Sequence, residues 1–150
     1  EELASEDYDL DVAGYGADYV ISNLSYDLTP TMTKIEQLFC LEDNIPRVHV
    51  QMPGQMWNLH IDKLQKWNPE NPETILRAMI HLTDWEQGHF WSYGNFVHTQ
   101  WRAGDVTTFD WANMPHSTAN AGFHPRVTLQ LTGIKTEKTQ EKLDWLAYRR

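Results

Sequence analysis

From residue 47 onward the chain consists of short apolar or alternating runs separated by turn residues such as Pro53-Gly54 and Gly94-Asn95. Runs of this length, bounded in this way, predict β-strands. The expected strands are residues 47–52, 56–62, 75–85, 90–93, 96–101, 106–111, 116–120 and 126–132. About eight short strands at such close spacing favour a sandwich or barrel over a fold in which strands and helices alternate.

Helical patterns flank the strand-rich region on both sides. Residues 29–43 are expected to form a helix that enters at Thr29-Pro30 and stops before Pro46, because apolar residues recur there at helical spacing. Residues 137–150 have a second helical pattern, with Leu143 and Leu146 on one face. We expect the two helices to brace the outside of a double-sheet roll spanning residues 47–133.

Composition indicates one folded domain covering residues 1–150. The 150 residues are 41% hydrophobic and 12% aromatic, which is enough to build a core. The formal net charge is −9, and six of the acidic residues fall within the first 11 positions, where Lys and Arg are absent. We therefore interpret residues 1–28 as an acidic N-terminal segment. Without a basic footprint, phosphate-driven nucleic-acid binding is not expected as the main activity.

Cys40 is the only cysteine, which excludes an internal disulfide and a cysteine-based zinc site. A single cysteine fits a reducing compartment, so we expect a cytoplasmic location. Neither an apolar run of the roughly 18 residues that span a membrane nor a signal-peptide pattern is found. The expected partner is a small-molecule or peptide substrate, with no membrane involved.

The residue types most typical of a metal site are His60-Ile61-Asp62 and, 54 positions after Asp62, His116. Residues i and i+2 of a strand point to the same side, so His60 and Asp62 can both face a barrel interior. Two imidazoles and one carboxylate are the ligands that hold ferrous ion on one face and leave the other face open. The alternative is a chance His-x-Asp pair, and five further histidines need another explanation. These are His49, His81, His89, His98 and His124.

Arg126 follows His116 by ten positions and opens a strand in which Arg126, Thr128 and Gln130 share one face. An arginine that faces inward would be an unpaired buried cation, which is unfavourable. A dicarboxylate would remove that cost through a bidentate contact, and Thr128 could donate a further hydrogen bond. The alternative is an exposed arginine at the start of a strand.

Residues from about 47 to 133 resemble the iron(II)/2-oxoglutarate-dependent dioxygenases, which have a double-stranded β-helix (jelly-roll, cupin-like) fold. The order that carries the resemblance is His60-Ile61-Asp62, Gly104-Asp105, His116, Asn120 and Arg126-Val127-Thr128. Met52-Pro53-Gly54 and Ile80-His81-Leu82 are similar to the aspartyl/asparaginyl β-hydroxylase branch. That branch tends to use two histidines alone, so Asp62 is a departure from it.

The resemblance implies roles for seven residues. His60, Asp62 and His116 would be the catalytic iron ligands, and Arg126 would hold the distal carboxylate of 2-oxoglutarate. Thr128, His81 and Gln51 would also line the cosubstrate site, with Asn58 as a further polar candidate. The alternative for Gln51 and Asn58 is a solvent-facing position on a strand. Four tryptophans near the motifs are candidates for a pocket wall or for core packing: Trp57, Trp85, Trp91 and Trp111.

The implied activity is hydroxylation of an amino acid, a peptide side chain or a small polar molecule. It would use Fe(II), 2-oxoglutarate and O2, and release succinate and CO2. Two alternatives remain open at the level of sequence. One is a cupin-like isomerase or dioxygenase that does not use 2-oxoglutarate, and the other is a non-catalytic jelly-roll binding module.

Overall fold

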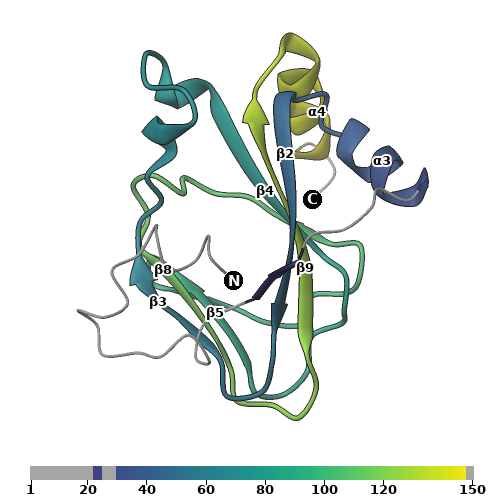
Figure 1. Ribbon diagram of the computed structural model, residues 1–150, viewed down its shortest axis with the longest axis vertical. Helices are drawn as coiled ribbons and strands as arrows, with labels where there is room; N and C mark the ends of the chain where they lie inside the picture. The colour runs from purple at the N-terminus through teal and green to yellow at the C-terminus, as the bar shows by residue number, and fades with distance from the viewer. Residues whose placement is uncertain (1–21, 25–29, 148–150) are drawn as a thin grey trace.

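Two antiparallel β-sheets face each other in the computed structural model of the chain, which describes residues 22–24 and 30–147 (Figure 1). The five-stranded sheet has the order β1 (Ser22–Leu24), β2 (Glu42–Gln51), β9 (Arg126–Ile134), β4 (Ile75–His81) and β7 (Val106–Thr107). The four-stranded sheet has the order β3 (Met56–His60), β8 (His116–Asn120), β5 (His89–Tyr93) and β6 (Phe96–His98).

From β2 to β5 consecutive strands alternate between the sheets, and β7, β8 and β9 alternate again. The chain therefore winds repeatedly from one sheet to the other, which is the topology of a double-stranded β-helix. The prediction of a mainly β, jelly-roll fold with flanking helices is confirmed.

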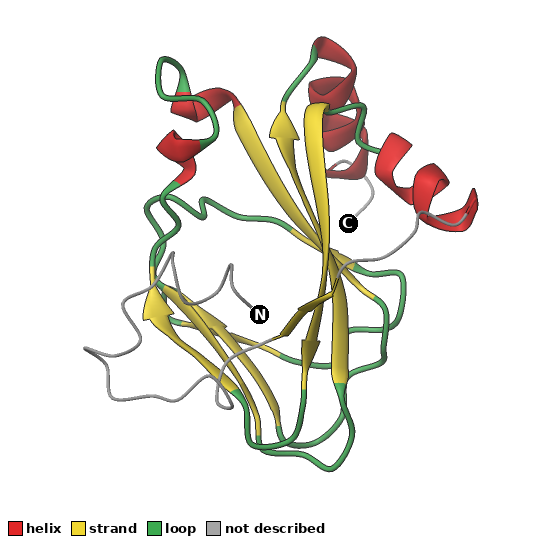
Figure 2. Cartoon of the chain, in the orientation of Figure 1, coloured by secondary structure: helices red, strands yellow, loops and turns green. Residues whose placement is uncertain are grey.

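The outer face of the five-stranded sheet is apolar and is covered by α3 (Pro30–Gln37) and α4 (Glu137–Ala147) (Figure 2). Val48, Leu129 and Leu131 belong to this cluster, together with Phe39 from the segment after α3. Ile35 of α3 and Leu143 of α4 pack against the same cluster. At roughly 25 cal/mol per Å² of apolar surface, this burial is the main force that holds the helices on the sheet.

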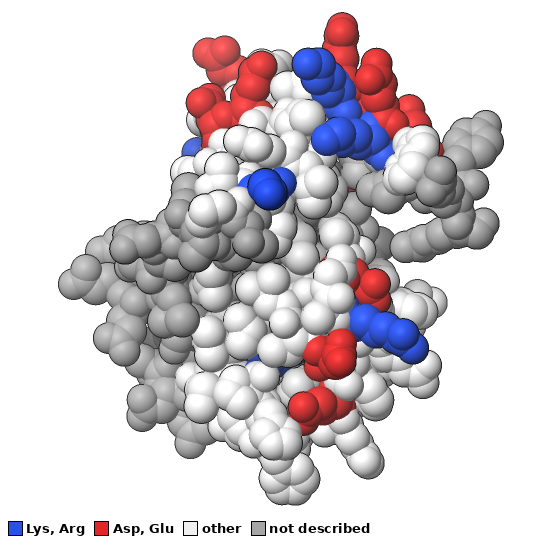
Figure 3. Space-filling model, turned by 90° about the vertical axis from the view of Figure 1, so that its right-hand side faces the viewer, with Lys and Arg blue, Asp and Glu red and all other residues white. Residues whose placement is uncertain are grey.

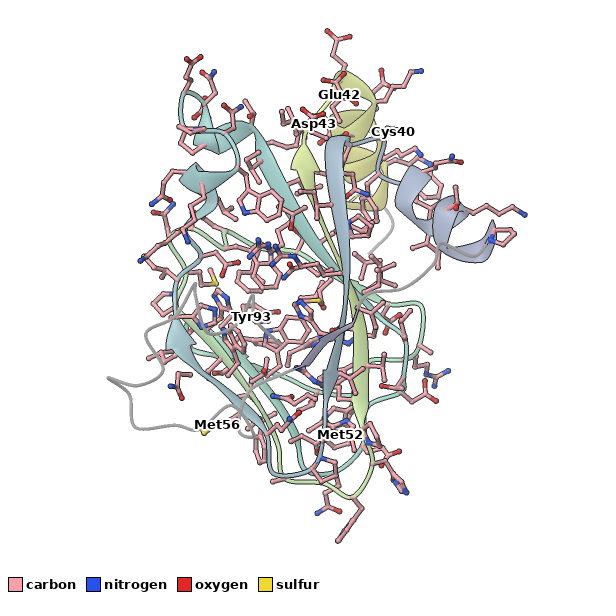
Figure 4. All side chains as sticks on the ribbon, in the orientation of Figure 1. Cys40, Glu42, Asp43, Met52, Met56 and Tyr93 are labelled. Atoms are coloured by element: carbon pink, nitrogen blue, oxygen red, sulfur yellow. The ribbon has the colours of Figure 1, made fainter. Side chains whose placement is uncertain are left out.

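The inner face of the same sheet is lined largely by polar residues and meets an aromatic cluster. Trp91, Trp101 and Trp111 are nearly inaccessible to solvent and pack with Met79 of β4. Tyr93 of β5 points into the space between the sheets (Figure 4) and packs against this cluster. Alternation along β9 thus puts the apolar residues outward, under the helices, and Arg126, Thr128 and Gln130 inward.

The first helix is shorter than expected. It ends at Gln37, whereas the sequence predicts a helix to residue 43, and β2 begins at Glu42 rather than at residue 47. Cys40 and Asp43 have φ values of 51° and 48°, in the left-handed region, so a right-handed helix cannot continue through them. Pro46 lies in β2 but outside the stretch that pairs with β1, where its missing N–H is tolerated.

Several strands end earlier than predicted. β4 stops at His81, β6 at His98 and β7 at Thr107, because loops rather than ladders follow them. The expected strand over residues 56–62 stops at His60, so Asp62 lies beyond the end of the strand. Of the acidic segment 1–28, only Ser22–Leu24 is described, as the strand β1. Residues 148–150 of the expected C-terminal helix also lie outside the described residues.

Charged side chains of both signs are interspersed on the face shown in Figure 3, where many gather at the end near the helices. Within residues 22–24 and 30–147, every helix is too short or too polar to cross a membrane.

Candidate metal centre

The pairing of β3 with β8 brings the rings of His60 and His116 into contact. The two residues are register partners, and a β-bulge between Trp57 and His60 shifts the alternation so that His60 meets His116. Their ring centroids are 4.3 Å apart. Nδ1 of His60 lies 2.6 Å from the carbonyl oxygen of Asn58, and Nδ1 of His116 lies 3.0 Å from that of Met114. Each Nδ1–H therefore donates to a carbonyl oxygen, so each Nε2 is unprotonated and carries a lone pair of electrons that can accept a hydrogen bond or bind a metal ion.

Asp62 completes the cluster from outside the strand. Its Oδ1 lies 3.4 Å from Nε2 of His60 and 3.5 Å from Nε2 of His116. The sequence predicts that strand alternation aims Asp62 inward, but this mechanism is wrong because β3 ends at His60. A hydrogen bond of 2.8 Å from the Asp62 N–H to the carbonyl oxygen of Trp111 holds the residue instead.

The donor set fits a divalent metal ion. One ligand atom from each of His60, Asp62 and His116 lies within 4.8 Å of the others, and Asp62 and His116 are buried. Two imidazole lone pairs and a carboxylate oxygen converge, and the Nδ1–H of each imidazole already donates to a carbonyl oxygen. A divalent cation between these acceptors would remove the repulsion between their lone pairs. These are also the ligand types of two-histidine, one-carboxylate iron sites.

The carboxylate of Asp62 is held in its charged form. Burial alone would raise the pKa of this carboxyl group, but interactions with His116 and His60 and the positive charge of Arg77 outweigh it. The pKa therefore lies well below the usual range of aspartate. Nη1 of Arg77 donates to Oδ2 of Asp62, which leaves Oδ1 as the atom facing the two imidazoles.

Arg126 is a second buried cation in the interior. Its side chain is 3% exposed, and Nε and Nη1 have no hydrogen-bond partner among the described residues. The guanidinium carbon lies 5.3 Å from the ring centroid of Trp91, which is the contact of a cation with an aromatic face. Burial lowers the pKa of Arg126 to about 10, so the group remains charged at neutral pH.

His49 is the register partner of Thr128 and lies two positions before Gln51 on β2. Burial lowers the pKa of His49 to about 3, and the charges of Arg77, Arg126 and Arg47 lower it further in that order. The charge of Asp62 acts on His49 in the opposite direction. His49 is therefore neutral, and it lies within electrostatic reach of the guanidinium of Arg126 as well as the carboxylate of Asp62.

The other predicted cosubstrate residues are buried on the same inner face. Gln51 is the register partner of Arg126, donates to Oγ1 of Thr118 over 3.1 Å, and has an Oε1 without a partner among the described residues. Thr128 is nearly inaccessible and pairs with His49 on β2 and His81 on β4.

His81 lies in an aromatic environment rather than beside the metal ligands. Its Nε2 is 3.0 Å from Oγ1 of Thr107, and its ring stacks on Trp101 at 4.5 Å. Burial lowers the pKa of His81 to about 3, with smaller contributions from His98 and Arg126. The residue is thus a neutral imidazole within electrostatic range of Arg126.

The four tryptophans divide between site and core. Trp57 donates to His60, Trp111 lies edge-on to His116 at 5.0 Å, and Trp91 lies beneath Arg126. Trp85 donates instead to the carbonyl oxygen of His89, at the start of β5 and away from the metal ligands.

Sequence reasoning missed Arg77 and His49. Arg77 is a charged residue within an otherwise largely apolar strand, Ile75–His81, two positions from Met79 and four from His81. That spacing places it on the same face as His81, which was the available signal. His49 has the same relation to Gln51 on β2, but nothing in the sequence distinguishes it from an exposed strand residue.

The fold and the convergent ligands define a double-stranded β-helix protein with a candidate metal centre. No protein-family model matches the sequence, and comparison with curated proteins gives no match.

Comparison with solved structures does give matches of low sequence identity. A cupin 2 conserved barrel domain protein from Salinispora arenicola is 13% identical, with a TM-score of 0.47 over 90% of this chain and 92% of that one. A conserved protein with a double-stranded β-helix domain from Klebsiella pneumoniae is 15% identical, with a TM-score of 0.48 over 86% and 90%. A protein described as a predicted oxalate decarboxylase from Thermotoga maritima is 13% identical, with a TM-score of 0.46 over 80% and 96%. These similarities concern the fold alone.

Proposed function

We propose that this protein is an Fe(II)- and 2-oxoglutarate-dependent oxygenase. The observation that carries the proposal is Arg126, a buried guanidinium with two donor nitrogens, Nε and Nη1, that lack partners among the described residues. A buried donor without an acceptor costs about 1–3 kcal/mol, and more when it is charged. An anionic ligand with a planar carboxylate would supply the missing acceptors.

The position of Arg126 supports a ligand that reaches the metal centre. Arg126 lies over Trp91, and the ring centroid of Trp91 is 6.0 Å from that of Trp111. The ring of Trp111 in turn lies 5.0 Å from that of His116. A dicarboxylate could bind Arg126 at one end and the metal ion at the other. 2-Oxoglutarate has this form, with a keto acid at the end opposite its distal carboxylate.

In this function His60, Asp62 and His116 would hold ferrous ion on one face. The ion, when bound, would supply oxygen activation coupled to the oxidative decarboxylation of 2-oxoglutarate. Arg126 would fix the distal carboxylate, and Trp91 and Trp111 would exclude water from the interior. The products would be succinate, CO2 and a hydroxylated amino acid, peptide side chain or small polar molecule.

The test measures metal binding and cosubstrate use separately. Purified protein loaded with Fe(II) should release succinate only when 2-oxoglutarate is present. Arg126→Met should raise the 2-oxoglutarate concentration at half-maximal turnover by at least about tenfold, because a charge-assisted hydrogen bond is worth about 1.5–3 kcal/mol. Its affinity for Mn(II) should change little.

Arg102→Met is the matched control, because Arg102 is exposed and belongs to the loop before β7. It should leave both quantities unchanged. Absence of 2-oxoglutarate turnover across amino acids, peptides and nucleobases, with Mn(II) binding retained, would exclude the oxygenase and leave the metal centre intact.

The second candidate is a cupin-like metalloenzyme, an isomerase or dioxygenase, that does not use 2-oxoglutarate. The observation that favours it is the charge of the buried side chains among the described residues, where Arg77 and Arg126 face one carboxylate, that of Asp62. An anionic substrate that binds the metal directly would also balance this charge. Metal-dependent turnover of such a substrate without 2-oxoglutarate would identify this activity.

A further inference from the structure

Arg77 holds one of the two carboxylate oxygens of Asp62. Its guanidinium is nearly buried, with the residue 8% exposed, and Nη1 donates to Oδ2 of Asp62. The other oxygen, Oδ1, is the atom that lies 3.4 Å and 3.5 Å from the two imidazole nitrogens. The two carboxylate oxygens therefore have different partners.

The guanidinium itself is fixed from a second direction. Nε of Arg77 donates to Oγ1 of Thr132 over 2.9 Å, and Thr132 is the register partner of Arg77 on β9. The guanidinium carbon lies 5.8 Å from the ring centroid of Trp67. Arg77 thus reaches Asp62 from β4, an internal strand of the five-stranded sheet.

Two further hydrogen bonds connect Arg77, Trp111 and Asp62 in a closed ring. The indole N–H of Trp111 donates to the carbonyl oxygen of Arg77 over 2.8 Å, and the N–H of Asp62 donates to the carbonyl oxygen of Trp111 over 2.8 Å. Both ends of Asp62 are therefore tied to Arg77, one directly and the other through Trp111. Because Asp62 follows the end of β3, this ring replaces the strand as the means of aiming the carboxylate.

We propose that Arg77 is a positioning residue that keeps Asp62 a one-oxygen ligand and so preserves open positions on the metal ion. An octahedral ion bound by His60, His116 and one oxygen of Asp62 has three positions left. If Oδ2 also bound the metal, two would remain. A chelating cosubstrate would then leave none for dioxygen. Partners outside the ligand set commonly orient metal ligands in this way.

The inference requires the metal centre of the proposed function but not its cosubstrate. Arg77→Gln is the sharpest variant, because the glutamine amide nitrogen occupies the position of the arginine Nε. It can still donate to Thr132 but is too short to reach Asp62. Arg77→Lys is the conservative variant, since its ammonium group retains a donor for Oδ2.

The experiment counts water molecules on bound Mn(II) from the broadening of its EPR lines in 17O-enriched water. Wild type and Arg77→Lys should show about three exchangeable waters, and Arg77→Gln about two, since a freed carboxylate can bind through both oxygens. The Mn(II) dissociation constant of Arg77→Gln should stay within about tenfold of wild type. The variant loses a contact that orients Asp62, but it also loses a positive charge that repels the metal ion. Its affinity for 2-oxoglutarate should fall at least about tenfold.

A wild-type count of two waters would overturn the inference without any variant. So would three waters in Arg77→Gln, or loss of Mn(II) binding by that variant while its thermal unfolding remains cooperative. Wild-type protein that binds no Mn(II) would overturn both this inference and the proposed function. Three waters in wild type and two in Arg77→Gln, without 2-oxoglutarate binding to either, would support the role of Arg77 and exclude the oxygenase.

Discussion

The indole N–H of Trp57 donates a hydrogen bond of 2.9 Å to Nε2 of His60. The acceptor is the same lone pair that faces Asp62 and that a metal ion would use. Trp57 and a bound metal therefore compete for one atom. The contact also agrees with the tautomer set by the Nδ1–H of His60, which donates to Asn58.

Trp57→Phe should strengthen divalent metal binding. The substitution keeps most of the aromatic surface but removes the donor, so the metal no longer has to displace a hydrogen bond worth about 1 kcal/mol. We expect the Co(II) dissociation constant to fall by about fivefold, measured by isothermal titration calorimetry. Trp85→Phe is the control, since its N–H donates to the carbonyl of His89. Weaker binding in Trp57→Phe would show that the indole supports the site.

His116→Ala should abolish turnover and weaken metal binding by at least about 100-fold, because loss of a partner outside the ligand set alone costs 10–100-fold. His124→Ala is the matched control, because His124 is exposed and pairs with Glu86 at 2.6 Å, on the surface. Metal binding can be followed by titration with Co(II). Retention of activity in His116→Ala would mean that another histidine is the ligand.

Stability against urea should rise with pH between about 4 and 6.5. The pKa of His81 is lowered to about 3 in the folded protein by burial, then by His98 and Arg126, while the unfolded chain titrates near 6.5. In this window the unfolded state binds more protons, so acidification favours unfolding by up to about 1.4 kcal/mol per pH unit for each such histidine. His49, with a pKa also lowered to about 3, adds to the effect.

His81→Gln should reduce this pH dependence, because glutamine does not titrate. His124→Gln should leave the slope unchanged, since His124 is exposed. Urea midpoints at several pH values give the slopes directly. A slope in His81→Gln equal to that of wild type would show that the imidazole of His81 is not the group responsible.

Leu129→Ala should destabilise the fold by about 2–5 kcal/mol, the range for deleting a fully buried leucine. Leu129 is 0% exposed and lies in the apolar cluster under the helices. Phe123→Ala removes a larger side chain that is 90% exposed and should change the free energy of unfolding by no more than about 0.5 kcal/mol. Equal effects in urea unfolding would contradict the assignment of the core to this outer face.

Local pattern was sufficient for the type of fold and for much of the inner face. Turn residues between short apolar runs predict the strands. Alternation along β9 places Arg126 and Thr128 on one face of the strand and Leu129 on the other. The lengths of β4, β6 and β7 were overestimated, because where a ladder ends depends on partner strands distant in sequence. The early end of α3 was missed for a different reason, since the left-handed backbone at Cys40 and Asp43 has no glycine to mark it.

The sequence by itself determined which side chains could bind a metal, since His60, Asp62 and His116 carry the necessary atoms in the necessary order. Tertiary structure alone decided how they meet. A bulge turns His60 toward His116, and a hydrogen-bonded ring through Arg77 and Trp111 aims Asp62 after its strand has ended. The physical reason is that these constraints join segments 15 to 56 positions apart, and neither periodicity nor spacing records such contacts.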